Sequence, residues 1–169
     1  MSWRTVVKKN SRMEALCDDL KSKGLEDSKQ LSRKLEELLD AGFSRADGCV
    51  LQTVQVHLRG NARLEDFPDR TGYECFVNHI HVEDYFDEDG SSDLLARLGQ
   101  GIAFANNLKE RLSAFSANEN FRLIVSSDES SCSVRFHVIR DGEEWLSPDL
   151  NRYQQEAILV IDTCTPGSV

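Results

Sequence analysis

The spacing of apolar residues in this 169-residue chain changes character near Gly48. Before that point, apolar side chains recur every three or four residues, which is typical of helices that bury one face. After it, apolar and polar residues alternate as in half-buried strands, and one long helical pattern interrupts the alternation. This order predicts an α+β fold with an N-terminal helical hairpin, a mostly antiparallel sheet of about five strands and one long central helix.

The first 42 residues carry the predicted hairpin. One helix runs from about residue 3 or 11 to Lys23, with Gly24 as its stop signal. Ser28 is placed to cap a second helix that ends at Gly42. Because the link is short, we expect the two helices to pack antiparallel.

Residues 48–82 predict a pair of strands. The run from Val50 to Leu58 alternates in apolar character, and so does the run from Tyr73 to Val82. The polar stretch between them contains Pro68 and is predicted to be a loop.

The long helix is predicted over residues 92–116, capped by Ser91 or Ser92. Gly99 and Gly101 lie inside it, and each costs about 1 kcal/mol relative to Ala in a helix interior. We therefore expect another element to pack closely against the helix at these glycines.

Residues 119–162 are predicted to be rich in strands. The expected elements, in order, are strands at 121–125 and 132–138, a tight turn at Asp141-Gly142, a strand at 144–146, a helical turn over 148–153 and a buried strand at 157–161. No convincing linker divides the chain, so residues 1–169 are expected to form a single domain.

The net charge of the chain argues against two classes of function, nucleic-acid binding and membrane binding. The chain has 20 Lys and Arg against 29 Asp and Glu, a net charge of -9. A nucleic-acid binder needs excess positive charge to displace counterions from phosphates, and docking on an anionic membrane has the same requirement. We therefore expect neither direct nucleic-acid binding nor membrane binding.

The acidic charge is concentrated in one segment that also contains two aromatic residues. Six carboxylates and no cation lie between residues 83 and 93. Aromatic rings among carboxylates are typical of interfaces in which a ring anchors and charges steer a basic partner. The predicted binding residues are Glu83, Asp84, Tyr85, Phe86, Asp87, Glu88, Asp89 and Asp93. Two alternatives stay open: a solvated loop, and a Phe86 side chain that fills the local core.

A metal site is the other candidate in this region. His79 and His81 share a strand face because side-chain direction repeats every two residues, and Glu83 continues that face. Ordinary strand histidines are the alternative. A calcium loop is not expected, because setting Gly90 at the glycine position of an EF-hand leaves Tyr85 at position 1 and Ala96 at position 12.

No pattern predicts covalent catalysis or a cofactor. Nucleotide loops and nucleophile elbows are missing from the sequence, and Cys132 and His137 are five residues apart and so face opposite sides of a strand. The five dispersed cysteines form no CxxC pair, and residues 1–10 carry no apolar run typical of a signal peptide. The sequence thus predicts a cytoplasmic protein that is not an enzyme and holds no cofactor.

The C-terminal third resembles a known pattern. The residues that carry the resemblance are Ser133–His137, Gly142–Leu146, Asp149, Leu150, Tyr153 and Glu156–Asp162. They are similar to the C-terminal pattern of small bacterial immunity proteins encoded beside polymorphic toxins, such as those of contact-dependent growth inhibition systems. The resemblance implies a cytoplasmic inhibitor that binds the C-terminal domain of a cognate toxin, often a nuclease.

Three functions therefore follow from the sequence. The first is an immunity protein that neutralises a basic toxin domain by stoichiometric association. The second is a metal-dependent enzyme or metal-binding protein that uses His79, His81 and Glu83. The third is a regulatory or scaffolding domain that associates through the leucine face of the N-terminal hairpin.

Overall fold

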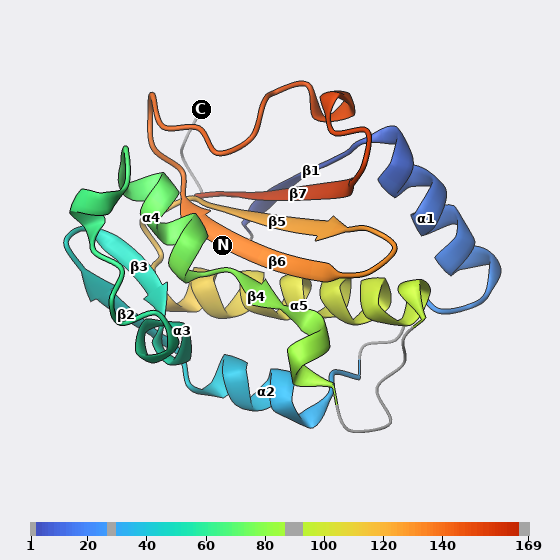
Figure 1. Cartoon of the computed structure of the whole chain (residues 1–169), viewed down its shortest axis with the longest axis horizontal. Coiled ribbons are helices and arrows are strands. Elements are labelled where there is room, and N and C mark those ends of the chain that lie inside the picture. The colour runs from blue at the N-terminus through green and yellow to red at the C-terminus, as the bar shows by residue number, and fades with distance from the viewer. Residues whose placement is uncertain (1–2, 27–29, 87–92, 166–169) are drawn as a thin grey trace.

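A computed structural model describes residues 3–26, 30–86 and 93–165. Its centre is a five-stranded sheet in the order β1-β7-β5-β6-β4, with every neighbouring pair antiparallel. The strands are β1 (Arg4–Lys9), β4 (Ile80–His81), β5 (Phe121–Ser127), β6 (Cys132–Val138) and β7 (Ala157–Cys164). Helix α5 (Leu94–Phe115) crosses one face of the sheet, and α2 (Arg33–Asp40) packs on α5 (Figure 1). The predicted α+β class with a five-stranded antiparallel sheet and a long central helix is confirmed.

The main core lies between α5 and the sheet. The helix buries Leu98, Phe104, Leu108 and Leu112 completely against strands that present alternate apolar residues. A Cβ atom at Gly101 would lie 2.6 Å from Cys132 Sγ, so glycine there lets the helix approach β6. The close packing expected at the helical glycines is confirmed at this position.

The cap of α5 differs from the prediction. Asp93 is the N-cap residue, and its carboxylate accepts a hydrogen bond from the Ala96 amide at 3.1 Å. Ser91 and Ser92, the predicted caps, lie outside the described residues.

The C-terminal strands follow the predicted pattern. β5, β6 and β7 cover the expected segments, and a 3-10 turn, η3 (Leu150–Arg152), lies within the expected helical turn. Asp141 and Gly142 do form a turn, with Gly142 at φ 77°. The strand predicted at 144–146 is wrong, because this segment leaves the turn and crosses the outer face of the sheet. There Leu146, Leu150 and Tyr153 pack on a second apolar cluster, which comprises Ile124, Ile158 and Val160.

The N-terminal hairpin is wrong in its arrangement. Residues 4–9 form β1, which pairs with β7, so only the later start of the predicted first helix holds: α1 spans Ser11–Ser22. Its expected stop at Gly24 is confirmed, with φ 66°. Helix α1 packs on β7 and α5, whereas α2 packs on α5 at a separate place (Figure 1). The predicted cap, Ser28, lies outside the described residues, and Ser32 caps α2.

The strand pair predicted over residues 48–82 is mostly wrong. A short hairpin of β2 (Phe43–Ala46) and β3 (Cys49–Gln52) turns at Asp47-Gly48, where both residues have positive φ. The remainder is helical: α3 (Thr53–Leu58), η1 (Leu64–Asp66), α4 (Arg70–Val77) and η2 (Val82–Tyr85). Side-chain caps explain the two α-helices, since Gln52 accepts from the Gln55 amide and Asp69 from the Gly72 amide.

Candidate functional site

A cavity of about 400 Å³ opens on the face of the sheet opposite α5. Strands β5, β6 and β7 form its floor, the segment after the Gly142 turn covers it, and the chain around β4 forms one wall. Its lining residues are His79, His81, Ile124, Ser126, Asp128, Ser131, Ser133, Arg135, Trp145, Leu146, Tyr153, Glu156 and Ile158. Its volume is within the range of small-molecule sites, which is about 300–1,000 Å³.

Arg135 projects from β6 into this cavity. Its guanidinium stacks on the Trp145 ring, with Cζ 5.1 Å from the ring centroid. Nη1 donates to the carbonyl of Cys75 at 3.2 Å. Burial lowers the pKa of Arg135, although an arginine stays charged at neutral pH. Among the described residues, no carboxylate lies within ion-pair distance of Arg135.

The two predicted histidines do lie together. The rings of His79 and His81 are 4.2 Å apart between centroids, on the wall of the cavity. His57 and His137 lie elsewhere, on α3 and on β6. Burial lowers the pKa of His79 to about 3, and the positive charge of Arg135 adds to this effect. His79 is therefore neutral at physiological pH.

Glu83 does not complete a metal-binding trio with these histidines. Its Oε1 is 3.7 Å from His81 Nδ1, and its Oε2 accepts a hydrogen bond from the Cys132 amide at 3.1 Å. In residues 3–26, 30–86 and 93–165, no three His, Cys, Asp or Glu side chains are grouped to hold a metal ion. Arg135 beside His79 further disfavours a cation at this place.

The aromatic residues of the acidic segment are partly buried. Tyr85 and Phe86 both pack against the main core. The Tyr85 hydroxyl accepts a hydrogen bond from Gln55 Nε2 at 2.8 Å, and its carbonyl accepts one from Ser32 Oγ at 2.7 Å. The alternative in which Phe86 fills the local core is consistent with this packing.

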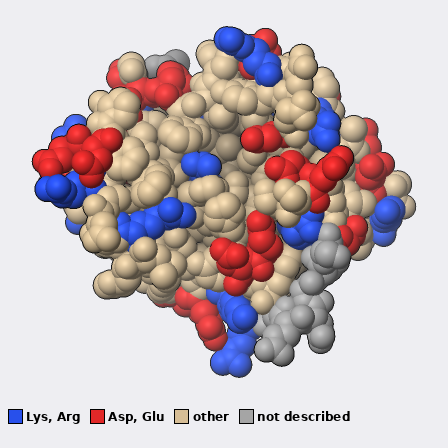
Figure 2. All heavy atoms as spheres, viewed as in Figure 1, with Lys and Arg blue, Asp and Glu red and all other residues tan. Residues whose placement is uncertain are grey.

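The acidic segment is fixed where it enters and where it leaves the described structure. At its entry, the Phe86 carbonyl accepts from Lys34 Nζ at 3.2 Å, and Asp84 is exposed. At its exit, Asp93 caps α5. The predicted binding residues Asp87, Glu88 and Asp89 lie outside the described residues. On the face seen in Figure 2, carboxylates lie in several separate groups with arginines and lysines between them.

Cys132 and His137 do not form a nucleophile–base pair. Cys132 faces the core and His137 the opposite side of β6, as predicted. Burial raises the pKa of Cys49 to about 11 and that of Cys132 to about 12, and it raises the pKa of Cys75 further. Thiols protonated in this way are poor nucleophiles.

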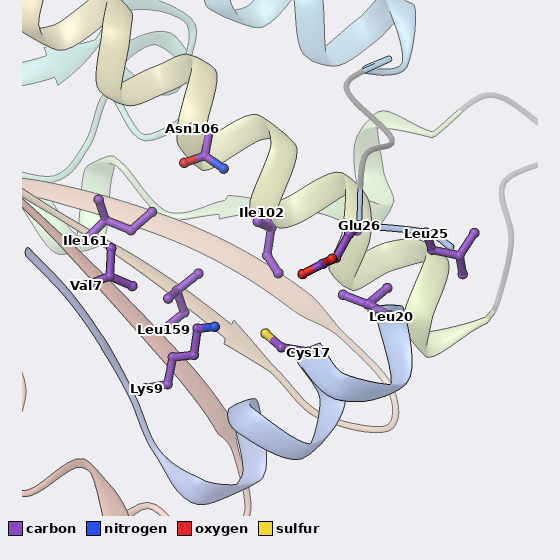
Figure 3. Close-up of a pocket in the computed structure, with 11 residues that line it drawn as sticks. Val7, Lys9, Cys17, Leu20, Leu25, Glu26, Ile102, Asn106, Leu159 and Ile161 are labelled. Carbon is purple, nitrogen blue, oxygen red and sulfur yellow. The ribbon is translucent and has the colours of Figure 1, made fainter. Parts of the chain in front are cut away.

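A second cavity, of about 360 Å³, lies between the edge strand β1, α1 and α5 (Figure 3). Val7 and Ile161 face it from the strands and Ile102 faces it from α5. Lys9 and Glu26 are the charged residues among the described residues that line it. The apolar lining suits hydrophobic contact rather than catalysis.

The leucine face proposed for self-association is not available. Leu31, Leu35, Leu38 and Leu39 are all buried in the main core. The third function predicted from the sequence therefore loses the surface on which it depended.

Comparisons with known proteins give one match. Residues 8–167 match the model of the Uncharacterized protein PM0498 family. No curated protein and no solved structure matches the chain significantly. In the described part of the chain, no helix has the length and apolar character to cross a membrane. Since the family model covers almost the whole sequence, the chain belongs to the Uncharacterized protein PM0498 family.

Proposed function

We propose that this protein is a cytoplasmic immunity protein that neutralises a basic toxin domain by stoichiometric binding. The acidic segment from Glu83 to Asp93 is its main contact surface, and the toxin domain is a nuclease. A nuclease cleft must attract phosphates and is therefore positively charged, so carboxylates that occupy the cleft exclude the substrate.

The observation that carries the proposal is the anchoring of both ends of the acidic segment. Tyr85 and Phe86 hold its entry through the core and through hydrogen bonds to the start of α2, and Asp93 holds its exit as the cap of α5. Anchored ends limit the conformational entropy that the segment loses on binding. Six like charges follow one another in this part of the sequence although their mutual repulsion disfavours it, and this supports a role in binding a basic partner.

Long-range attraction between this segment and a basic domain predicts fast association that depends on salt. Electrostatic steering raises association rates well above those of uncharged surfaces, and salt screens it over about 8–10 Å at ordinary ionic strength. Dissociation depends more on the contacts made after docking. Charge changes in the segment are therefore expected to act mainly on the association rate.

The test uses the C-terminal domain of an exported protein encoded immediately upstream. Stopped-flow association is measured for the native protein and for a variant with Asp87, Glu88 and Asp89 replaced by Lys. The matched control carries the same charge change at three exposed carboxylates elsewhere, Glu65→Lys, Asp141→Lys and Glu144→Lys.

We expect the first variant to associate at least tenfold more slowly at low salt, and the control to change much less. Equal slowing in both variants would mean that only net charge matters. Native association rates in the first variant would remove the acidic segment from the interface. Failure of the native protein to bind the domain or to protect cells that express it would refute the proposed function.

A further inference from the structure

The sheet-face cavity is positively charged at one end, although the protein as a whole is acidic. Arg135 lines the cavity, and Arg59 lies nearby, where its Nη2 donates to the carbonyl of His79 at 3.4 Å. The Arg59 guanidinium also stacks on the Phe76 ring, with Cζ 4.9 Å from the ring centroid. Burial lowers the pKa of His79, and the charges of both arginines add to this effect. Two cations thus lie together beside a half-enclosed space.

Neither arginine forms an ion pair with a carboxylate of the described residues. Among the described residues, no Asp or Glu oxygen is within 4 Å of the Arg59 or Arg135 guanidinium. Only one hydrogen bond from the Arg135 guanidinium is made within that part of the chain, from Nη1 to Cys75. Its remaining N–H groups therefore need acceptors from outside the fold.

The carboxylates that do line the cavity are engaged by other donors. Asp128 accepts from the amides of Ser130 and Ser131 at 2.8 Å. Glu156 is exposed and accepts from Ser126 Oγ at 2.6 Å. Neither carboxylate forms an ion pair with Arg135, although the charge of Glu156 attracts the guanidinium over a longer distance.

We propose that the cavity binds a small ligand through an oxyanion, a phosphate or a carboxylate, held by the Arg135 guanidinium. A guanidinium presents paired N–H groups whose geometry matches two oxygens of such an anion. Trp145 fixes the plane of the guanidinium by stacking, which reduces the entropy lost when a ligand binds. The Ser133 hydroxyl, two residues along β6 on the same face, and the rings of His79 and His81 are the neighbouring polar groups.

The site is independent of the toxin-binding proposal. It lies on the outer sheet face and uses none of the carboxylates that the toxin test replaces. The titration below uses the protein alone, so that either proposal can fail without the other.

Sodium phosphate and sodium acetate are the two probes, each added at constant ionic strength with chloride as the balancing anion. The protein carries Trp3→Phe, which leaves Trp145 as its only tryptophan. Binding is followed by Trp145 fluorescence and by the ring signals of the four histidines in ¹H–¹³C spectra. Phosphate separates a phosphoryl ligand from the carboxylate ligand that acetate represents.

At least one probe should give a saturable change in Trp145 fluorescence, with ring shifts at His79 and His81 and none at the exposed His57. Arg135→Gln should weaken binding at least tenfold. Arg135→Lys, which keeps the charge but not the paired donors, should weaken it less. If Arg135→Gln does not fold, Arg135→Lys and the pattern of histidine shifts decide.

Two results would overturn the proposal. One is the absence of saturation with both probes. The other is a saturable response that remains unchanged in the Arg135 variants or that shifts His57 as much as His79.

Discussion

Two glycines in α5 give a quantitative test of the packing between this helix and the sheet. Gly99 and Gly101 lie two residues apart in the same helix, so Gly→Ala improves the helix propensity equally at both, by up to about 1 kcal/mol. Their surroundings differ. A new Cβ at Gly99 meets nothing closer than Leu20 Cδ2 at 3.9 Å, whereas a Cβ at Gly101 lies 2.6 Å from Cys132 Sγ.

The difference between the two variants isolates the steric cost, because the propensity gain cancels. A contact of 2.6 Å is far inside ordinary van der Waals distance, and Val125 and Val82 already stand 3.6 Å from the same Cβ position. Overpacking of a core costs about 1–3 kcal/mol. Gly99→Ala should therefore raise the free energy of unfolding. The free energy of unfolding of Gly101→Ala should be about 1–3 kcal/mol lower than that of Gly99→Ala.

Urea denaturation followed by circular dichroism measures both variants. The cause is checked by a double-mutant cycle with Cys132→Ala, which removes the sulfur atom that the new methyl group meets. The penalty of Gly101→Ala should shrink by at least about 1 kcal/mol in that background, since the clash at Sγ is gone. The reasoning is refuted if the two glycine variants are equally stable, or if the Gly101 penalty is the same with and without the sulfur.

Three further predictions concern side chains that differ in burial. Glu74 is fully buried and pairs with Arg140 at 2.8 Å, so Glu74→Ala should cost about 3–5 kcal/mol in urea denaturation, and Glu74→Gln should cost less because it keeps an acceptor. The pKa of His79 is lowered from its usual 6.5 to about 3. Between these two pH values the unfolded chain binds a proton on His79 that the folded protein does not bind. The free energy of unfolding therefore has its full value above about pH 6.5 and decreases as the pH falls toward 3. The loss of unfolding free energy between pH 7 and pH 5 should therefore be smaller in His79→Gln than in the native protein. Iodoacetamide at pH 8 should label Cys164 first, since the other four cysteines are buried, and all five should react in urea; mass spectrometry reads the order.

Long apolar patterns predicted their elements well. The C-terminal strands and α5 each carry several apolar residues in a consistent period, and each buries that face on the same core. In such segments local preference and tertiary packing favour the same structure.

Short patterns failed where capping side chains decided the structure. Val54, Val56 and Leu58 fit a strand alternation, yet Gln52 caps a helix there and Leu58 is 67% exposed. In α4, Asp69 is a recognisable N-cap signal that the alternation of Cys75 and Val77 outweighed in the sequence interpretation. A period of two over three or four residues does not separate a strand from one helical turn.

The burial of Glu74 was not predictable from local sequence. Its carboxylate accepts from the amides of Val50 and Val138 and pairs with Arg140, which is 66 residues away. A lone glutamate inside an apolar run looks like a surface residue until the distant arginine is placed. The same holds for Arg135 and Trp145, whose contact depends on the path of the chain after the Gly142 turn.

The residues from His79 to Phe86 connect the two proposed sites, which determines how the sites must be tested. His79 and His81 line the cavity, Glu83 holds the Cys132 amide of β6, and Tyr85 and Phe86 pack in the core. Substitution of Glu83 or Tyr85 would remove contacts of the fold, so weaker binding in such variants could come from lost structure. The charge changes at residues 87–89 and the Arg135 variants leave Glu83 and Tyr85 in place, and the stability of the Arg135 variants is measured because they lose the hydrogen bond to Cys75. A loss of binding in those variants, with stability unchanged, therefore reports on the sites themselves.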